Sequence, residues 1–329
     1  MGDSSRRAIV TGAAGQDGSY LCELLLEKGY EVHGITRETT ENPKAGGQQS
    51  AIVWHPGGLG DQGRLDDLLE QVAPREIYHL AAASHVAKSF DNPWAVTEAI
   101  GGNTVRLLEA MRSVCPDARL FHASSAEIFG NPDQSPQNEN TPLAPISPYG
   151  AAKTFSTHMV RIYRQAYGLF GVNGILYNHE SVRRGGDFVT RKICRGAATI
   201  SLGQQENLHL GNIEAARDWG YAPDYVRGMW TSLQHDKPMD YIMATGRLHR
   251  VKDVLEAAFS LLNLDWREHV VIDEDLFRPT EPTRLIGDAS RARQTLGWQA
   301  ETRFETFIQE MTESELEKLS DSPNQEDHS

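Results

Sequence analysis

The sequence predicts an α/β protein built on a doubly wound parallel sheet, with a smaller mixed part toward the C-terminus. From residue 8 to about residue 176, short apolar runs alternate with amphipathic stretches, which is typical of repeated βα units. A glycine-rich turn after the first apolar run supports the same arrangement. The expected strands are Ala8–Thr11, Glu31–Thr36, Ala51–Trp54, Glu76–Leu80, Arg119–Ala123 and Gly171–Leu176. Apolar residues at helical spacing predict helices at Tyr20–Glu27, Leu65–Val72, Val105–Arg112 and Tyr149–Tyr167.

Length and composition are those of an ordinary globular protein. The 329 residues are 39% hydrophobic and 23% charged, and no apolar run is long enough to span a bilayer. Because the start, Met1 to Arg7, lacks an apolar signal core, we expect a cytoplasmic protein with no membrane partner. The net charge of -13 argues against nucleic acid as a partner. The three cysteines and twelve histidines show no metal-ligand spacing, so no metal site is expected.

The glycine-rich turn covers residues 11–18 and reads Thr-Gly-Ala-Ala-Gly-Gln-Asp-Gly. Glycines let the chain turn sharply and let a pyrophosphate approach backbone N–H groups at the positive end of the next helix. A glycine triplet alone is weak evidence, and a purely structural turn is the alternative. The position after a strand and before a helix is the context of the Rossmann-type fingerprint. We therefore predict that this turn binds a dinucleotide.

The chain is expected to divide near residue 177. Residues 1–177 form the dinucleotide-binding Rossmann domain, and residues 178–319 form mainly the substrate-binding part, with a helix at Phe188–Ile200 and a strand at Leu208–Leu210. Segments near 212–246 are expected to return to the sheet, so the two parts interleave. Residues 320–329 form an acidic tail, which we expect to be disordered.

A second motif, Ser-Pro-Tyr-Gly-Ala-Ala-Lys, covers residues 147–153. Proline can start a helix, and Tyr149 and Lys153 then fall four residues apart on one face. An ammonium group beside a phenol favours the phenolate, which lowers the phenol's pKa from its usual value of about 10. Tyr149 is thus a candidate base for a sugar hydroxyl as a hydride leaves. An exposed helical pair is the alternative, and the strand that ends in Ala-Ser-Ser at residues 123–125 argues against it.

Eight segments together resemble the GDP-mannose 4,6-dehydratase family of extended short-chain dehydrogenases. The Asn-His-Glu-Ser sequence at 178–181 and the Thr-Arg-Lys-Ile sequence at 190–193 are the most specific of them, and the resemblance extends to about residue 319. The segments are residues 11–18, 80–86, 125–127, Tyr149 with Lys153, 178–181, 183–185, 188–193 and 217–220. The resemblance implies an NAD(P)-dependent hydro-lyase that acts on a nucleotide-linked hexose, and a homodimer or homotetramer.

The resemblance also implies a catalytic role for four residues. Tyr149 would deprotonate the C4 hydroxyl while hydride passes to the nicotinamide, and Lys153 would hold the ribose and tune Tyr149. Ser125 stands where the family has threonine and can donate a hydrogen bond to the C4 oxygen. Glu127 would remove the C5 proton and protonate the departing C6 hydroxyl, after which hydride returns to C6. A solvated glutamate is the alternative for Glu127.

The resemblance also implies residues that bind the cofactor and the substrate, and they outnumber the catalytic ones. Lys192 and Arg217 suit the diphosphate because both are cations. The cofactor-binding residues are Gly12, Gly15, Gln16, Asp17, Gly18, Arg37, Gly58, Leu59, Leu80, Ala81, Ala82, Ser84, Tyr149, Lys153, His179 and Arg184. The substrate-binding residues are Ser84, Glu127, Asn178, Lys192, Arg217, Arg278 and Glu281.

Departures from the family pattern leave NADP and NAD both open as the cofactor. Gly58 stands where the family has an acidic residue that contacts the adenine. Arg37 could meet a 2′-phosphate, but Glu38 follows it where a second arginine is usual. A carboxylate there would repel the phosphate and suit the free ribose hydroxyl of NAD.

Other departures concern the substrate. The family's Thr-Ser-Glu is Ser-Ala-Glu here, Gly186 replaces a glutamate, and Ala95 replaces a tyrosine that touches the cofactor. A dehydratase of another sugar nucleotide or of a sugar nucleoside, a nucleotide-sugar epimerase and a non-catalytic nucleotide-binding regulatory protein therefore stay as alternatives. Glu127 separates the first two classes of enzyme, because elimination needs an acid–base group that epimerisation does not.

Overall fold

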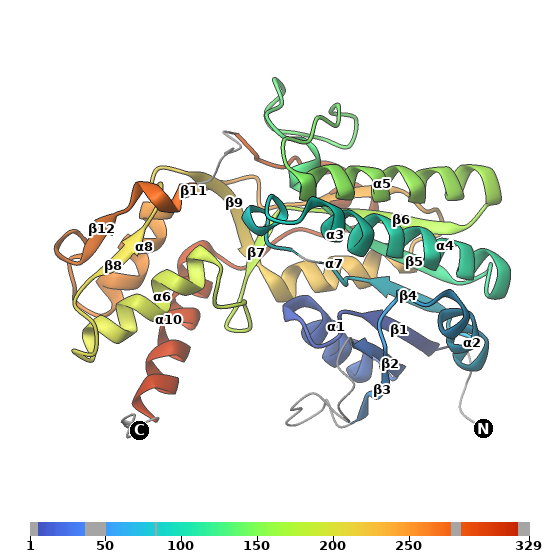
Figure 1. The fold of residues 1–329 in the computed structure, drawn as a ribbon, viewed down its shortest axis with the longest axis horizontal. Coiled ribbons are helices and arrows are strands. Elements are labelled where there is room, and N and C mark those ends of the chain that lie inside the picture. Colours follow the sequence, from blue (N-terminus) through green and yellow to red (C-terminus); the bar gives the residue numbers. More distant parts are fainter. Residues whose placement is uncertain (1–5, 37–50, 83, 278–283, 322–329) are drawn as a thin grey trace.

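The larger part of the molecule is a parallel sheet of seven strands (Figure 1). The computed structural model describes residues 6–36, 51–82, 84–277 and 284–321. The strands lie in the order β10-β6-β5-β4-β1-β2-β3, and every neighbouring pair is parallel. Their bounds are β1 Arg7–Thr11, β2 Glu31–Thr36, β3 Val53–Pro56, β4 Glu76–His79, β5 Arg119–Ser125, β6 Phe170–Leu176 and β10 Asp240–Met243.

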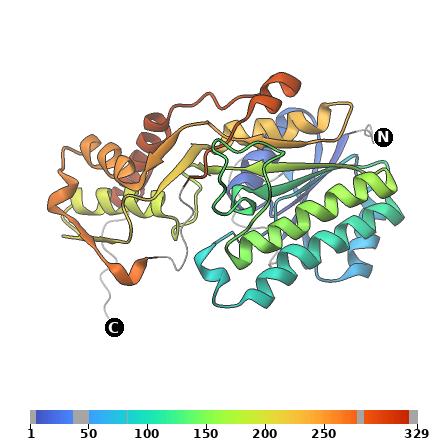
Figure 2. The same cartoon turned by 90° about the horizontal axis from the view of Figure 1, so that it is seen from above.

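Helices cover both faces of this sheet. The helices α1 (Gln16–Glu27) and α7 (Ala222–Gln234) share one apolar cluster with it. On the other face, α2 (Gln62–Val72), α4 (Asn103–Val114) and α5 (Pro148–Tyr167) share a second cluster. Figure 1 shows α4 and α5 above the sheet and α1 below it, and Figure 2 shows α4 and α5 side by side. The predicted doubly wound Rossmann-type fold is confirmed.

The strand order reverses its direction between β1 and β4. In doubly wound sheets this topological switch point is where ligands bind. From β1 the chain builds outward through β2 and β3, then returns to place β4, β5 and β6 on the other side. The loops after β1 and β4 therefore run to opposite faces, which opens a crevice at the carboxyl ends of the strands. Short helical segments follow β4 and β5, namely η3 Ala87–Ser89, α3 Pro93–Thr97, the π-helix η4 Glu98–Gly102 and η5 Ala126–Ile128.

The smaller part is mixed. The strands β7 (Asn178–Glu180), β9 (Ala216–Tyr221) and β11 (Leu248–Arg250) form one sheet, with β7 and β9 parallel and β11 antiparallel to β9. The strands β8 (Leu208–Leu210) and β12 (Val270–Ile272) form a parallel pair. The helices α6 (Val189–Ser201), α8 (Val251–Leu261) and α10 (Phe304–Ser320) pack through one apolar cluster. The remaining helices are η6 Trp266–Glu268, η7 Glu274–Leu276 and α9 Ser290–Leu296.

Several element bounds differ from the expected ones. The third strand lies at Val53–Pro56 rather than at Ala51–Trp54, and α1 begins at Gln16 because the glycine turn leads directly into it. The strand β10 lies beside β6, after the chain has passed through the smaller part. The division at residue 177 stays a prediction. Of the expected tail, Ser320 ends α10, and residues 322–329 lie outside the described residues. No helix of the described residues is long and apolar enough to cross a bilayer.

Candidate active site

The glycine turn fits closely against its surroundings. Gly12 has a φ of 71°, and a Cβ added there would lie 3.0 Å from the backbone of Ala81. A Cβ on Gly18 would lie 2.2 Å from the carbonyl oxygen of Gly12. Gly15 is the N-cap of α1, so the first N–H groups of that helix face the turn. These glycines leave the room in which a pyrophosphate fits, so the residues present suit a dinucleotide.

One cavity of about 1280 Å³ lies at the carboxyl ends of the sheet strands. Twenty predicted site residues line it: Gly12, Gly15, Gln16, Asp17, Gly18, Gly58, Leu59, Leu80, Ala81, Ala82, Ser84, Ser125, Glu127, Tyr149, Lys153, Asn178, His179, Arg184, Lys192 and Arg217. The predicted residues Arg37, Arg278 and Glu281 lie outside the described residues. The fold thus brings together every predicted site residue that the structure describes.

The helix α5 presents Tyr149 and Lys153 to this cavity. The Ser147 side chain accepts a hydrogen bond from Gly150 N at 3.0 Å, which caps the helix just before Pro148. The Tyr149 side chain is buried, and its ring centre lies 5.9 Å from Lys153 Nζ. Lys153 Nζ donates to the Ala123 carbonyl oxygen at 2.6 Å. The pair therefore lies at the end of β5, on the helix face that the spacing predicts.

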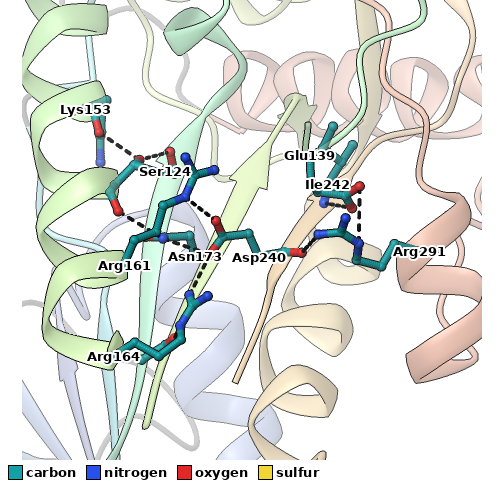
Figure 3. A network of polar contacts seen from close by, with 11 residues as sticks. Ser124, Glu139, Lys153, Arg161, Arg164, Asn173, Asp240, Ile242 and Arg291 are labelled. Atoms are coloured by element: carbon teal, nitrogen blue, oxygen red, sulfur yellow. Dashed lines mark hydrogen bonds and ion pairs between the residues drawn. The ribbon is translucent and has the colours of Figure 1, made fainter. Parts of the chain in front are cut away.

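A polar network fixes α5 against the sheet (Figure 3). Thr157 Oγ1 donates to the Lys153 carbonyl oxygen at 2.8 Å and lies 2.6 Å from Ser124 Oγ. Farther along the helix, Arg161 and Arg164 both bond to the carboxylate of Asp240, at 2.5 and 2.6 Å. These contacts tie α5, which carries Tyr149 and Lys153, to the strands β5 and β10.

Burial dominates the proton affinities of the pair. Burial raises the pKa of Tyr149 to about 12, while a hydrogen bond from Ser125 opposes the rise. Burial lowers the pKa of Lys153 to about 8, and the charge of Asp17 opposes that change. The expectation that Lys153 lowers the pKa of Tyr149 below 10 is wrong in this structure, because desolvation outweighs every other influence on the phenol.

Glu127 lies on the wall of the same cavity. Its backbone N–H donates to Ser125 Oγ at 3.3 Å in the short helix η5, and the residue is 9% exposed. Its charge raises the pKa of Tyr149, so the carboxylate is within electrostatic reach of the phenol. Glu127, Ser125 and Tyr149 therefore converge on one region, as an elimination requires.

Asp17 and His179 form an ion pair that the sequence does not reveal. His179 Nε2 lies 2.8 Å from Asp17 Oδ2, and His179 Nδ1 lies 2.7 Å from the Tyr177 carbonyl oxygen. Both partners only accept hydrogen bonds, so both ring nitrogens carry protons and His179 is an imidazolium. The two residues are 162 positions apart, and no pattern signals that they pair.

Two cations line the cavity on the side of the smaller part. On α6, Lys192 Nζ donates to the His209 carbonyl oxygen at 2.7 Å, and on β9 Arg217 Nη1 donates to the Ala216 carbonyl oxygen at 2.7 Å. Arg184 instead lies within electrostatic reach of Asp17 and Tyr149, and its Nε lies 3.1 Å from the buried carboxylate of Glu180. Lys192 and Arg217 therefore form the region that suits an anionic ligand.

The sequence belongs to a known family across most of its length. The family model described as GDP-mannose 4,6 dehydratase matches residues 9–311. The chain belongs to this family. GDP-mannose 4,6 dehydratase 1 of Arabidopsis thaliana is 46% identical over 94% of this chain and 90% of its own length. GDP-mannose 4,6 dehydratase of Homo sapiens is 42% identical over 98% of this chain and 95% of its own length.

Solved structures share the fold of this GDP-mannose 4,6-dehydratase family member. The UDP-glucose 4-epimerase of Thermus thermophilus, in complex with NAD, has a TM-score of 0.82 and 24% identity, covering 94% of this chain and 98% of its own. RMD of Pseudomonas aeruginosa, complexed with NADPH, has a TM-score of 0.78 and 20% identity, covering 97% of this chain and 100% of its own. The family uses NAD(P), and both forms of the cofactor occur on this fold.

The structure adds cavity residues to those that the family resemblance implies. They lie outside the segments that carry the resemblance, so only the fold brings them to the site. Among them are Asn103, Asp187, Asn212 and Phe277. Asp187, which lines the cavity, forms an exposed ion pair with Lys88 on η3. No signal in the sequence indicates this contact.

Proposed function

We propose that this chain catalyses the 4,6-dehydration of GDP-mannose or of a closely related GDP-sugar. Its family and the relatives at 42% and 46% identity support the reaction. The observation that carries the proposal is Glu127 on the wall of the cavity that also holds Ser125, Tyr149 and Lys153. An epimerisation would use the hydroxyl donor and the tyrosine alone. A carboxylate beside them supplies the additional proton transfer of an elimination.

NAD(P) is the cofactor, and the cofactor end of the cavity has the shape for it. Gly12 and Gly18 would receive the pyrophosphate, and Lys153 would contact the nicotinamide ribose. When bound in oxidised form, NAD(P) would supply a reversible acceptor for the C4 hydride and a positive charge that favours the ionised form of nearby acids. NADP and NAD stay alternatives, since Arg37 and Glu38 lie outside the described residues.

Tyr149 removes the proton of the C4 hydroxyl in the first step. Because burial raises its pKa to about 12, Tyr149 is a neutral phenol at pH 7 in this structure, and it needs a neighbouring positive charge to act as a base. Lys153 has a pKa of about 8, so it supplies an ammonium group at neutral pH. Ser125 donates to the C4 oxygen and stabilises the charge that develops there.

Glu127 completes the elimination. Oxidation at C4 makes the C5 hydrogen acidic, and the carboxylate of Glu127 takes it as a proton. The same carboxyl group gives a proton to the C6 hydroxyl, which leaves as water while a double bond forms between C5 and C6. Hydride addition at C6, and transfer to C5 of the proton that Tyr149 took from the C4 hydroxyl, then give the 4-keto-6-deoxy sugar and leave Tyr149 and Glu127 in their starting protonation states. The overall change is the loss of one water, with no net oxidation.

The cationic end of the cavity would hold the nucleotide diphosphate. Arg217 and Lys192 bond backbone carbonyl oxygens through the contacts above, and a diphosphate can replace those acceptors with charge-assisted bonds. Ser84 and Asn178 would contact the sugar. Arg278 and Glu281, which the family resemblance also implies in substrate binding, lie outside the described residues.

Incubating the purified protein with GDP-mannose and a catalytic amount of NADP or NAD tests this function. We expect a product that has lost one water and carries a 4-keto group, with no accumulation of NAD(P)H. Steady accumulation of NAD(P)H would indicate a dehydrogenase, and an isomer of unchanged mass would indicate an epimerase. A nucleotide that raises the melting temperature, without any turnover of the nucleotide sugar, would favour the non-catalytic nucleotide-binding alternative.

The assembly and location follow from the same family. We propose a homodimer or homotetramer in the cytoplasm, with a nucleotide-sugar as its small-molecule partner. Light scattering during size-exclusion chromatography measures the mass of the particle. A monomer at micromolar concentration would contradict the assembly without affecting the proposed reaction.

A further inference from the structure

Two buried histidines lie side by side beneath the cavity. His79 on β4 and His122 on β5 are opposite each other in the sheet, and their ring centroids are 5.5 Å apart. They are 3% and 1% exposed. Both ring nitrogens of His79 have hydrogen-bond partners, whereas neither nitrogen of His122 has one among the described residues. Burial, and then the charge of Lys153, lowers the pKa of His79 to about 3, so it is neutral at any working pH.

The contacts of His79 define one direction of hydrogen bonding. Thr11 Oγ1 accepts hydrogen bonds from Leu80 N at 3.1 Å and Ala81 N at 3.0 Å. These two bonds use the lone pairs of the hydroxyl, so its proton points to His79 Nδ1 at 3.0 Å. His79 Nδ1 is therefore the acceptor, and His79 Nε2 carries the ring proton.

The other ring nitrogen continues the chain. Thr104 Oγ1 donates to the Ile100 carbonyl oxygen at 2.7 Å, which leaves it free to accept from His79 Nε2 at 3.2 Å. Every polar hydrogen in this chain of hydrogen bonds has one acceptor, and a single neutral tautomer of His79 satisfies all of the bonds. Removing the imidazole would leave two buried threonine hydroxyls each short of a partner.

This chain of hydrogen bonds joins three elements that face the cofactor end of the cavity. Thr11 begins the glycine turn, and Leu80 and Ala81 begin the loop after β4. Ile100 lies in the π-helix η4, and its neighbours Ala99 and Asn103 line the cavity. The backbone of Ala81 already approaches Gly12 so closely that an added Cβ would lie at 3.0 Å. A shift of any one element would therefore move the wall that a dinucleotide contacts.

We propose that His79 is a positioning residue for the dinucleotide site, which it assembles by holding the glycine turn, the loop after β4 and η4 together through Thr11 and Thr104. The inference rests on the proposed use of this cavity for NAD(P). His79 touches neither the cofactor nor the sugar. It acts by fixing the backbone of Leu80 and Ala81 opposite the glycine turn.

Replacing each histidine in turn by phenylalanine tests the proposal, with calorimetric measurement of the dissociation constant for NADP and for NAD. His79→Phe removes both hydrogen bonds of the imidazole. We expect it to raise the dissociation constant of the preferred cofactor at least tenfold, since one lost buried hydrogen bond already accounts for about tenfold. The turnover number at saturating cofactor should fall much less. The matched variant His122→Phe loses no hydrogen bond and should bind as the wild type does. His79→Gln, which keeps an acceptor and a donor, should recover part of the affinity.

The outcomes separate this inference from the proposed function. If His79→Phe binds the cofactor as tightly as the wild type, or if His122→Phe weakens binding equally, His79 has no positioning role. If the wild type binds neither NADP nor NAD, the proposed function fails and the inference with it. Should His79→Phe not fold, Thr104→Val interrupts the same chain with little change of shape, and an unchanged dissociation constant for that variant would overturn the inference.

Discussion

The two ends of the cavity are built from different parts of the chain. At the cofactor end, backbone and small residues at the ends of parallel strands form the wall, as Gly12 and Ala81 show. At the proposed substrate end, two long cationic side chains line the cavity, Lys192 on α6 and Arg217 on β9. The cofactor end is therefore a property of the fold, whereas the substrate end is a property of individual side chains.

This difference predicts how each end responds to mutation. Changes at the cofactor end move the backbone and so affect every ligand that contacts it. Changes at the substrate end remove one interaction and leave the rest in place. Glu127 stands at the boundary between the two ends, because it lies in η5 directly after β5 but is proposed to act on the sugar.

Glu127→Gln should therefore give the largest loss of activity. The amide cannot take the C5 proton, so we expect dehydration to fall by roughly 10²- to 10⁴-fold while the dissociation constant of the cofactor stays unchanged. Product formation measured by mass spectrometry and cofactor binding by calorimetry check the two parts. Glu139→Gln is the matched control, since Glu139 bonds to Ile242 N at 3.0 Å outside the cavity. Retained dehydration in Glu127→Gln would contradict the proposed mechanism.

Arg217→Met tests the substrate end alone. Losing one charge-assisted hydrogen bond of about 2 kcal/mol should raise the KM for the nucleotide sugar roughly thirtyfold, with little change in cofactor affinity. Steady-state kinetics at saturating cofactor measure this effect. The control variant Arg250→Met removes an exposed cation from the neighbouring strand β11, outside the cavity. An equal rise of cofactor dissociation constant in Arg217→Met would mean that the two ends are not independent.

The same contrast explains which features the sequence predicts. The glycine turn and the Tyr149–Lys153 spacing are local patterns, and the parallel sheet carries them to one edge, so the cofactor end and the catalytic pair follow from the sequence. Every described residue that the family resemblance implies lines the cavity. Proximity in a doubly wound sheet is a consequence of topology, which the alternation of strands and helices already indicates.

The sequence does not predict features that depend on how deeply a side chain is buried or on pairing between residues far apart in the chain. The pKa of Tyr149 rises to about 12 because burial outweighs its neighbours, and burial cannot be read from a four-residue spacing. Asp17 and His179 pair across 162 positions. The hydrogen-bond chain through His79 depends on two threonine hydroxyls from different elements. Thr11 begins the glycine turn and Thr104 has no motif around it, and nothing in the sequence pairs either threonine with His79.

The Asp17–His179 pair gives a dependence on pH where the cofactor end meets β7. Burial lowers the pKa of His179, but the charge of Asp17 reverses this and raises it above 6.5. Burial raises the pKa of Asp17, but His179 lowers it below 3.8. The stability from His179 is complete below about pH 6.5 and is lost as the pH rises through its folded pKa. The stability from Asp17 is present above about pH 4 and is lost as the pH falls through its folded pKa.

Asp17→Asn should therefore lower the melting temperature most between about pH 4 and 6.5. We expect a difference from the wild type of roughly 2–4 °C at pH 5.5 that narrows by pH 9. Differential scanning calorimetry at the two values measures it. Ser181→Ala removes a neutral hydrogen bond from Ser181 to Gln16 in the same cluster, so its effect should be the same at both pH values. A difference for Asp17→Asn that grows toward pH 9 would exclude an imidazolium at residue 179.

The ion pair between Lys88 and Asp187 should have the smallest effect. It joins the loop after β4 to the loop before α6, and its side chains are 63% and 64% exposed. Solvent and salt screen such a pair, so Lys88→Met or Asp187→Asn should change the KM for the nucleotide sugar only about twofold at low ionic strength. The effect should vanish at about 1 M salt, where charges are screened beyond roughly 3 Å.

Exchanging the two charges separates bridging from direct contact with the substrate. If the pair only ties the loops together, Lys88→Asp combined with Asp187→Lys restores the wild-type KM, because the bridge is intact in reverse. If Asp187, which lines the cavity, faces the diphosphate, the exchange instead lowers the KM by adding a cation at the substrate end. The exposed pair Lys252–Glu214, 2.7 Å apart and outside the cavity, is the control, and exchanging its charges should leave the KM unchanged. The two results therefore distinguish whether Asp187 contacts the substrate directly or only ties the two segments together.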